Sequence, residues 1–326
     1  MIVVTFFVAA ISIATVLLYG CVGEIITEKA GHLNLGIPGI MCAGTAGGCL
    51  GVSIYMQTLA QGAEASWLPL ILMAFFFSCL FSVIVGGIYA LLTVTLRCNQ
   101  NITGLAITIF GAGAADFLIP VIRDGKADLF DAAGKVVSAP LPFANDWGWF
   151  GQIFLGHGIF VYIGIAIAVL SAFVLAKTRV GLHLRAVGES PATADAAGIP
   201  VTAYKYVAIL VGSAVAGLGG FYYTMDYIKG SWENAGTIEA FGWLAIALVI
   251  FALWKPHFGI VGALIFGACS IVAPVFSNVF NATQREIVKL LPYVITLVVL
   301  VITSIVDNKE NQPPASLGQS YFREER

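Results

Sequence analysis

The stretch Thr178–Gly198, which reads TRVGLHLRAVGESPATADAAG, separates two long apolar runs of the chain. The run from Trp147 to Ala176 before it and the run from Tyr206 to Met225 after it contain no charged residue. Three cations gather within the stretch or directly before it: Lys177, Arg179 and Arg185. Because cations collect in the cytoplasmic loops of membrane proteins, this pattern predicts a cytoplasmic loop between two membrane-spanning segments.

Helix signals follow within the same stretch. Ser190 is a residue type that caps helices, Pro191 suits the first helical position, and Gly198 suits the position after a helix. We therefore expect a helix over 191–197, of about seven residues, which is too short to cross a bilayer. Composition alone leaves two interpretations open: a structured loop, or a helix on which a cytoplasmic partner docks.

The composition is not that of a soluble globular chain. Of the 326 residues, 59% are hydrophobic and only 10% are charged, whereas about 25% charged is usual for soluble proteins. The formal net charge of −2 and the lack of a basic patch with interleaved aromatic residues argue against nucleic-acid binding. The chain is expected to be an integral membrane protein in contact with lipid.

Charge-free runs define the expected spans, because an unpaired charge is costly at the centre of a bilayer. Spans of this length and composition are expected to be helical, since helices satisfy their own backbone hydrogen bonds in lipid. The segment 240–254 is short for a full crossing and suits a half-helix. The expected fold is therefore an all-α polytopic membrane protein with interrupted helices and about nine spans, near 2–22, 37–58, 67–95, 104–121, 153–176, 205–225, 240–254, 258–279 and 288–306.

The distribution of Lys and Arg predicts the orientation. With 178–203 in the cytoplasm, alternation places more of these cations inside than outside, the N-terminus outside and the C-terminus in the cytoplasm. The chain then divides into a transmembrane domain, 1–306, and a polar cytoplasmic tail, 307–326. Within the domain, 123–149 is the expected extracytoplasmic loop.

The sequence offers no catalytic or metal-binding motif. It contains no G-x-x-x-x-G-K-[ST] stretch for ATP phosphates, no H-E-x-x-H and no C-x-x-C pair. Its four histidines are far apart, and its six cysteines lie mostly inside apolar runs as small buried residues. We therefore expect no catalytic residue, no metal ligand and no cofactor on this chain.

Polar residues inside apolar runs are better candidates for a site, because they must face a bundle interior or a water path. In the stretch 23–39, Gly36, Pro38 and Gly39 would interrupt a helix entering the membrane, and discontinuous helices often line transport sites. An ordinary loop ahead of the second span is the alternative. The stretch 239–243, EAFGW, opens the short apolar segment and is a second candidate interruption.

Three adjacent amides, Asn99, Gln100 and Asn101, stand at the start of the fourth span. One amide suits a helix cap, whereas three suit a polar cavity or a helix-packing network. Asp116 is a lone acid late in the same span and fits the outer interface. The glycines and alanines between 212 and 220 predict close helix packing and not a binding site.

Together these segments resemble a known family. GLHLRAVGESPATADAAGIPV followed by SAVAGLGG resembles the cytoplasmic coupling segment of permeases in the branched-chain amino acid and simple sugar group of ABC importers. The nucleoside branch, whose binding proteins are basic-membrane-protein lipoproteins, is the closer match. Other segments agree in order along the chain: GEIITEKAGHLNLGIPGIM, NQNITGLAIT, LGHGIFVY, FGWLAIALVIFALWKP, LPYVITLVVLV and PASLGQSY. The chain departs from the family pattern at 27–30 (TEKA) and at Ile37-Pro38.

The resemblance implies a permease in a bacterial plasma membrane that pairs with a second, homologous permease. An ABC ATPase subunit, carrying ATP and Mg, would dock below, and an extracytoplasmic lipoprotein would deliver a nucleoside or simple sugar. The predicted coupling residues are Arg185, Glu189, Ser190, Pro191, Ala194 and Gly198, with Ala194 and Ala197 keeping one face of the helix small.

The predicted solute path contains Asn34, Asn101, Phe110, Glu239 and Trp243. Amides would bond the base edge or ribose, and Phe110 or Trp243 would stack on the ring; lipid-facing packing is the alternative for both aromatics. Two other functions remain open. A stand-alone ion-coupled secondary transporter or channel would need titratable groups at mid-membrane, and a membrane scaffold would transport nothing.

Overall fold

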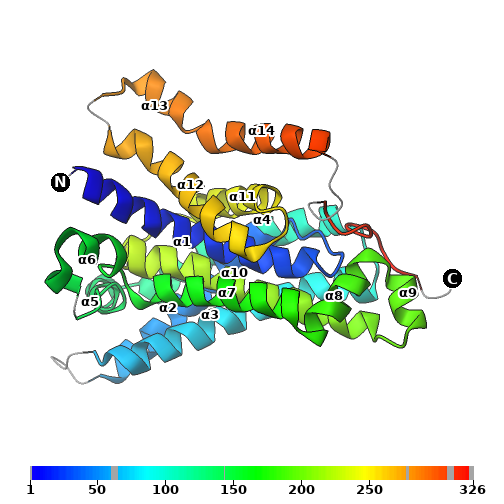
Figure 1. Ribbon diagram of the computed structural model, residues 1–326. Helices are drawn as coiled ribbons and strands as arrows, with labels where there is room; N and C mark the ends of the chain where they lie inside the picture. The colour runs from blue at the N-terminus through cyan, green and yellow to red at the C-terminus, as the bar shows by residue number, and fades with distance from the viewer. Residues whose placement is uncertain (1, 60–64, 143, 277–278, 307–311, 323–326) are drawn as a thin grey trace.

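The computed structural model describes residues 2–59, 65–142, 144–276, 279–306 and 312–322, and every regular element in these ranges is helical. The chain runs back and forth along one axis, with the N-terminus at one end of the bundle and the C-terminus at the other (Figure 1). The α-helices are α1 (Ile2–Glu28), α2 (Ile37–Thr58), α3 (Trp67–Ala90), α4 (Gln100–Arg123), α5 (Ala127–Val137), α6 (Gly148–Phe154), α7 (Ile159–Lys177), α8 (Arg179–Glu189), α9 (Pro191–Ala196), α10 (Val201–Tyr222), α11 (Gly236–Phe251), α12 (Pro256–Val275), α13 (Ala282–Val288) and α14 (Leu291–Val306).

Seven helical segments of the described chain are long and apolar enough to cross a membrane. α3 and α10 are lengthened by π-helical turns, η1 (Leu91–Thr95) and η3 (Tyr223–Tyr227). The expected spans at 240–254 and 288–306 correspond to α11 and α14, which have 16 residues each. A helix of that length rises only about 24 Å, less than the roughly 30 Å of a bilayer core. The all-α polytopic fold is confirmed, whereas nine full spans are not.

α2 is the central helix. In its most apolar window, 89% of the residues are buried, and it packs against α3, α4, α10 and α11. Glycine makes these contacts close: a Cβ on Gly44 would lie 2.5 Å from the Cα of Gly217 in α10. The small residues at 212–220 therefore pack helices together, as the sequence predicts.

Several helix boundaries differ from those that charge predicts. Glu24 and Glu28 lie inside α1, and Lys205 lies inside α10, all three at most 3% exposed. These side chains are buried in the bundle and do not face lipid, so α1 continues past Glu24 to Glu28 and α10 begins four residues before Lys205. The interrupted helix expected over 23–39 is also corrected. α1 runs unbroken to Glu28 and α2 begins at Ile37, with Pro38 in its first turn, where proline is tolerated.

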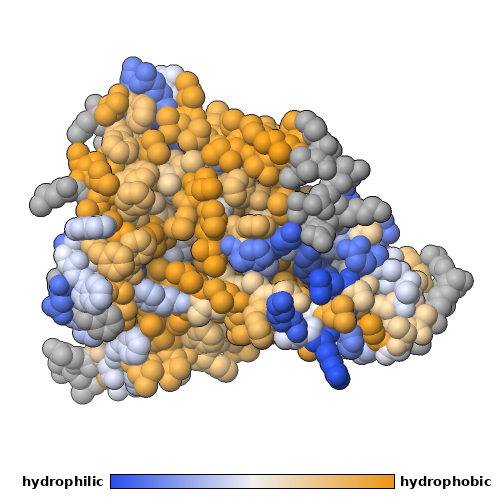
Figure 2. Space-filling view, viewed as in Figure 1, coloured by the Kyte–Doolittle hydropathy of each residue, from blue (hydrophilic) through white to orange (hydrophobic). Residues whose placement is uncertain are grey.

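The two ends of the bundle collect its polar surface (Figure 2). Orange, apolar atoms cover the middle, and blue, polar atoms gather near α5, α6 and α13 at one end and near α8 and the C-terminal tail at the other. The tail, residues 312–322, the α1–α2 loop and α8–α9 are joined by hydrogen bonds. We call this end the coupling end. Segments that alternation assigns to one side of the membrane therefore do lie at one end of the molecule.

The expected loop 123–149 lies at the opposite end and is largely helical. It contains α5, the short 3-10 helix η2 (Ala144–Trp147) and the start of α6. Phe130 of α5 is fully buried, and Gly134 allows close contact with the backbone of Lys229. This segment is thus a packed cap on the helices and not an open loop.

Candidate functional site

α9 forms as its sequence signals predict. Ser190 is the N-cap, and its Oγ accepts a hydrogen bond from the Thr193 backbone N–H at 3.4 Å. Pro191 occupies the first turn. Gly198 has a φ of +82°, a left-handed conformation that glycine adopts without a steric penalty. The expected helix over 191–197 is observed as Pro191–Ala196.

A second helix, which sequence reasoning missed, carries α9. α8 begins at Arg179, directly after Thr178, whose Oγ1 accepts a hydrogen bond from the Gly181 N–H at 3.1 Å. Its apolar side meets α9 and α10 in a small core of Val187, Ala194 and Val201. The helix α9 is therefore packed against α8 and α10 and is not part of an open loop. We call α8 and α9 together the platform.

The predicted coupling residues differ in how exposed their side chains are to solvent. Arg185, Glu189 and Gly198 are exposed, and Ser190 and Pro191 are half-buried. Ala194 is only 3% exposed, so it packs inward and does not offer a small face to a partner. Ala197, by contrast, is exposed.

The C-terminal tail braces this platform, which the sequence does not foretell. The Ser316 N–H and Oγ both donate to the Gly188 carbonyl, at 3.0 and 2.5 Å. The Tyr321 hydroxyl donates to Asp195 Oδ2 at 2.8 Å, so the tail is tied to α9 as well. A hollow of about 230 Å³ separates the start of α9 from residues 315–321. The exposed surface beside α9 is therefore built by both segments.

Glu189 links the two segments. Its Oε2 accepts a hydrogen bond from the Ala315 N–H at 3.4 Å. Its negative charge also interacts electrostatically with Lys29 in the α1–α2 loop. Burial lowers the pKa of Lys29, and the Glu189 charge opposes that shift. Glu189 thus faces the tail and a cation of the loop at the same time.

The α1–α2 loop is held from within the bundle. Asn34 is fully buried, its N–H donates to Glu24 Oε1 at 2.8 Å, and its Oδ1 accepts the Gly36 N–H at 2.9 Å. Its Nδ2 has no partner among the described residues. Glu28, one of the departures from the family pattern, accepts a hydrogen bond from Trp254 Nε1. Asn34 therefore shapes the loop that enters α2.

The three adjacent amides have three different environments. Asn99 caps α4 by accepting the Ile102 N–H at 3.0 Å. Gln100 is buried and joins the Leu33 N–H, at 2.9 Å, to the Gln319 carbonyl, at 3.3 Å. Asn101 is exposed. The structure thus supports a cap for the first amide and a packing network for the second, and Asn101 stays a candidate for contact with a solute.

The remaining candidates for the solute path lie on α4 and α11. Phe110 is 55% exposed on the side of α4. Glu239 and Trp243 are half-buried one turn apart on α11, with Trp243 Nε1 at 3.5 Å from Glu239 Oε1. Asn34 lies in the α1–α2 loop and Asn101 in the first turn of α4, both nearer the coupling end than Phe110.

Asp116 joins these two helices. Its Oδ1 accepts a hydrogen bond from the Ala235 N–H at 2.7 Å, and Cys42 of α2 lies beside the Ala235 carbonyl. α11 therefore begins alongside α2 and α4, well inside their length, as a half-helix would. We call the exposed sides of α4 and α11 the α4–α11 face.

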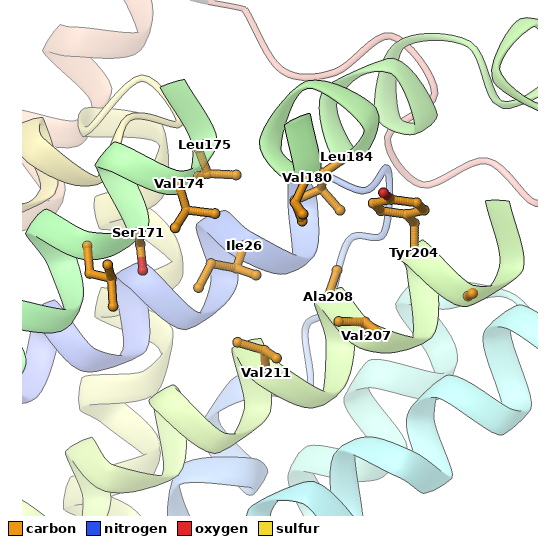
Figure 3. Close-up of a pocket in the computed structure, with 12 residues that line it drawn as sticks. Ile26, Ser171, Val174, Leu175, Val180, Leu184, Tyr204, Val207, Ala208 and Val211 are labelled. Carbon is orange, nitrogen blue, oxygen red and sulfur yellow. The ribbon is translucent and has the colours of Figure 1, made fainter. Parts of the chain in front are cut away.

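An apolar groove of about 470 Å³ lies among α1, α7, α8 and α10 (Figure 3). Side chains from all four helices, such as Ile26, Val174, Leu184 and Val207, point toward it. None of the described residues that line it is charged, so the groove does not suit a polar solute. Among the described residues there is also no cluster of His, Cys, Asp or Glu that would hold a metal ion.

Comparison with known proteins gives a consistent result. A family model described as "Branched-chain amino acid transport system / permease component" matches residues 6–300. The chain is 30% identical to the guanosine ABC transporter permease protein NupQ of Bacillus subtilis, over 98% of this chain and 96% of that one. It is 28% identical to the nucleoside ABC transporter permease protein NupC of Lactococcus lactis, over 88% of each chain.

A third relative is the putative glucose ABC transporter permease protein TsgC13 of Haloferax volcanii, 29% identical over 97% of each chain. No solved structure matches this chain. The family model covers nearly all of the bundle, from α1 to α14, and includes the platform of α8 and α9. The chain therefore belongs to the family of permease components of branched-chain amino acid transport systems.

Proposed function

We propose that this chain is the permease subunit of an ATP-driven importer of nucleosides, located in a bacterial plasma membrane. The observation that carries the proposal is the full-length likeness to two permeases named for guanosine and for nucleosides. A simple sugar is the second candidate solute, because a permease named for glucose matches over the same length. The two solute classes share a hydroxyl-rich sugar ring.

The coupling end supports docking of a separate ABC ATPase subunit. The short helix α9 is fixed between an N-cap and a left-handed glycine, and the tail braces it. It would therefore move together with the bundle. Closure of an ATPase around α9 would therefore be passed to α10 and to the α1–α2 loop. ATP and Mg would be bound by that subunit, and this chain would hold no cofactor.

The α4–α11 face supports pairing with a second, homologous permease. On α4 it presents large exposed apolar side chains such as Ile109, Phe110 and Phe117, and on α11 it contains the half-buried Glu239. A solute path between two permeases would be completed by the partner chain. An extracytoplasmic lipoprotein would deliver the solute at the end formed by α5 and α6, with the N-terminus outside and the tail in the cytoplasm.

Affinity purification of the chain from its native membrane tests the assembly. We expect an ABC ATPase, a second permease and a lipoprotein to co-purify, and uptake of labelled guanosine to stop when ATP hydrolysis is blocked. Uptake that persists without hydrolysis would favour an ion-coupled carrier. Labelled glucose, offered to the same cells, separates the two solute classes.

Orientation has its own test. A cysteine introduced at exposed Ala192 in α9 should react with a membrane-impermeant maleimide only after the membrane is permeabilised. A cysteine at exposed Asp131 in α5 should react in intact cells. The reverse result would place the coupling end outside and remove the basis for a cytoplasmic ATPase.

A further inference from the structure

A cavity of about 720 Å³ opens at the coupling end, apart from the surface around the start of α9. It lies between η1 with the connection that follows it, the end of α9 with its connection to α10, the start of α10, the α1–α2 loop and the tail. Its titratable lining groups come from several segments: His32, Arg97, Asp195, Lys205 and Tyr321. A space of this size accommodates a small organic molecule.

The cavity contains a buried cation without a counter-ion. Lys205 is one turn into α10 and is 3% exposed. No carboxylate of the described residues lies within 4.0 Å of its ammonium group. Arg97 adds a second positive charge at the cavity edge. Removing a cation from water is unfavourable unless an anion compensates it, so an anion bound beside Lys205 would be stabilised.

A buried histidine next to Lys205 also lacks a partner. His32 is 1% exposed, and neither Nδ1 nor Nε2 has a hydrogen-bond partner among the described residues. Burial, together with the Lys205 charge, lowers the pKa of His32 to about 3. The ring is therefore neutral at physiological pH and retains one N–H that can donate.

The first turn of α10 faces the same cavity. Residues 201–203 line it, and Pro200, the N-cap residue, provides no side-chain cap. The first amides of a helix have no acceptor within the helix and carry partial positive charge. For this reason helix N-termini favour anions, and here the helix is 22 residues long.

We propose that this cavity is a binding site for a phosphate group, carried by a small organic phosphate or by an anionic lipid. Lys205 and Arg97 supply the charge, and the first amides of α10 supply hydrogen bonds. Asp195 also lines the cavity, but its Oδ2 accepts a hydrogen bond from Tyr321. Its charge would repel the phosphate, so the group is placed on the Lys205 side.

The test is equilibrium binding to the full-length chain, purified in neutral detergent with any subunits that accompany it. Calorimetric titration with glycerol 3-phosphate should give a binding signal, and glycerol, which lacks the charge, should give none. Lys205→Met should weaken binding by about tenfold or more, because a charge-assisted hydrogen bond is lost. Lys205→Arg should retain binding, and Lys177→Met, an exposed lysine at the same end, should leave it unchanged.

A second arm separates the two sources of phosphate. The chain is placed in nanodiscs of anionic or of zwitterionic phospholipid, and its melting temperature is compared for wild type and Lys205→Met. A lipid headgroup at the site would stabilise only the wild type, and only in anionic nanodiscs. Absence of binding in both arms, or equal binding by Lys205→Met and Lys177→Met, would overturn the proposal. Because neither readout requires transport, the result is independent of the proposed import function.

Discussion

The coupling end and the α4–α11 face are built in opposite ways. At the coupling end, the tail donates to the Gly188 carbonyl and to Asp195, so separate segments are tied by hydrogen bonds. On the α4–α11 face, Asp116 accepts a hydrogen bond from the backbone N–H at the start of α11, and this bond joins α4 to α11. Phe110 on the same face is exposed. This difference fits the proposed function, in which an ATPase would dock at the coupling end and a partner permease would complete the α4–α11 face.

Replacing one glycine by alanine in each region should give the largest difference in stability between the two regions. A Cβ on Gly188 would lie 3.1 Å from the Lys29 carbonyl carbon and 3.2 Å from the Pro314 Cβ. Gly188→Ala should therefore lower stability by roughly 3 kcal/mol through overpacking. Gly113 in α4 has nothing within 4 Å of such a Cβ, and Gly113→Ala should raise the stability of the isolated chain by about 0.5–1 kcal/mol.

Thermal unfolding of the two purified variants in detergent measures this contrast. Equal destabilisation of both would mean that the α4–α11 face is as tightly packed as the coupling end. Stability of Gly188→Ala equal to wild type would show that the tail and the α1–α2 loop are not pressed against α8.

The buried His32 predicts that stability depends on pH. Its pKa is about 3 in the folded chain and about 6.5 when unfolded, so the unfolded state binds the proton more readily between these values. The stability that it contributes is complete above about pH 6.5 and is lost as the pH falls toward 3. At pH 5 the loss is about 2 kcal/mol.

The measurement compares melting temperatures of wild type and His32→Gln from pH 5 to pH 8 in phosphate-free buffer. The difference between the two should grow in favour of the variant as the pH falls. His257→Gln, an exposed histidine at the same end, is the matched control. A constant difference across this range would contradict a buried, neutral imidazole.

Loosening α9 without disturbing the bundle should uncouple ATP hydrolysis from solute. Pro191→Gly removes the fixed φ at the start of the helix, and Glu189→Ala removes the acceptor for the Ala315 N–H. We expect solute-stimulated ATPase activity of the assembled transporter to fall about tenfold, within the range of typical coupling energies. Ser190→Thr keeps a capping hydroxyl and should retain most of the stimulation.

The smallest effect is expected on the α4–α11 face. If Phe110 stacks on a solute ring, Phe110→Leu should raise the KM of uptake about threefold, a loss of under 1 kcal/mol. Phe173→Leu, an equally exposed phenylalanine on α7, should leave the KM unchanged. Equal KM values for both variants would assign Phe110 to packing against lipid or the partner permease.

Sequence reasoning was strongest where the determinants are local. Ser190, Pro191 and Gly198 act within a few residues of one another, and the helix they predict forms. It was weaker where a charge had two possible environments. The charges of Glu24 and Lys205 predict span ends near 22 and 205, yet both residues are buried inside helices, because a bundle interior can accept a charge that lipid cannot.

The contacts of the tail could not be predicted from the sequence. Residues 314–321 have no periodic apolar pattern, and only their small side chains indicate close contact with another segment. Their partners, Gly188, Gly31 and Gln100, are more than 100 residues away along the chain. Nothing local specifies such a pairing, and the same is true of Asp116 and Ala235, which join α4 to α11.

The sequence by itself determined that this is a helical membrane protein, where its main apolar segments lie and how α9 begins and ends. These properties depend on hydrophobicity summed over each segment and on capping within a single turn. The tertiary structure alone decided that the tail braces α8, that the adjacent amides divide into a cap, a bridge and an exposed group, and that Lys205 and His32 share one cavity. Those outcomes depend on contacts between distant segments, which exist only once the bundle is packed.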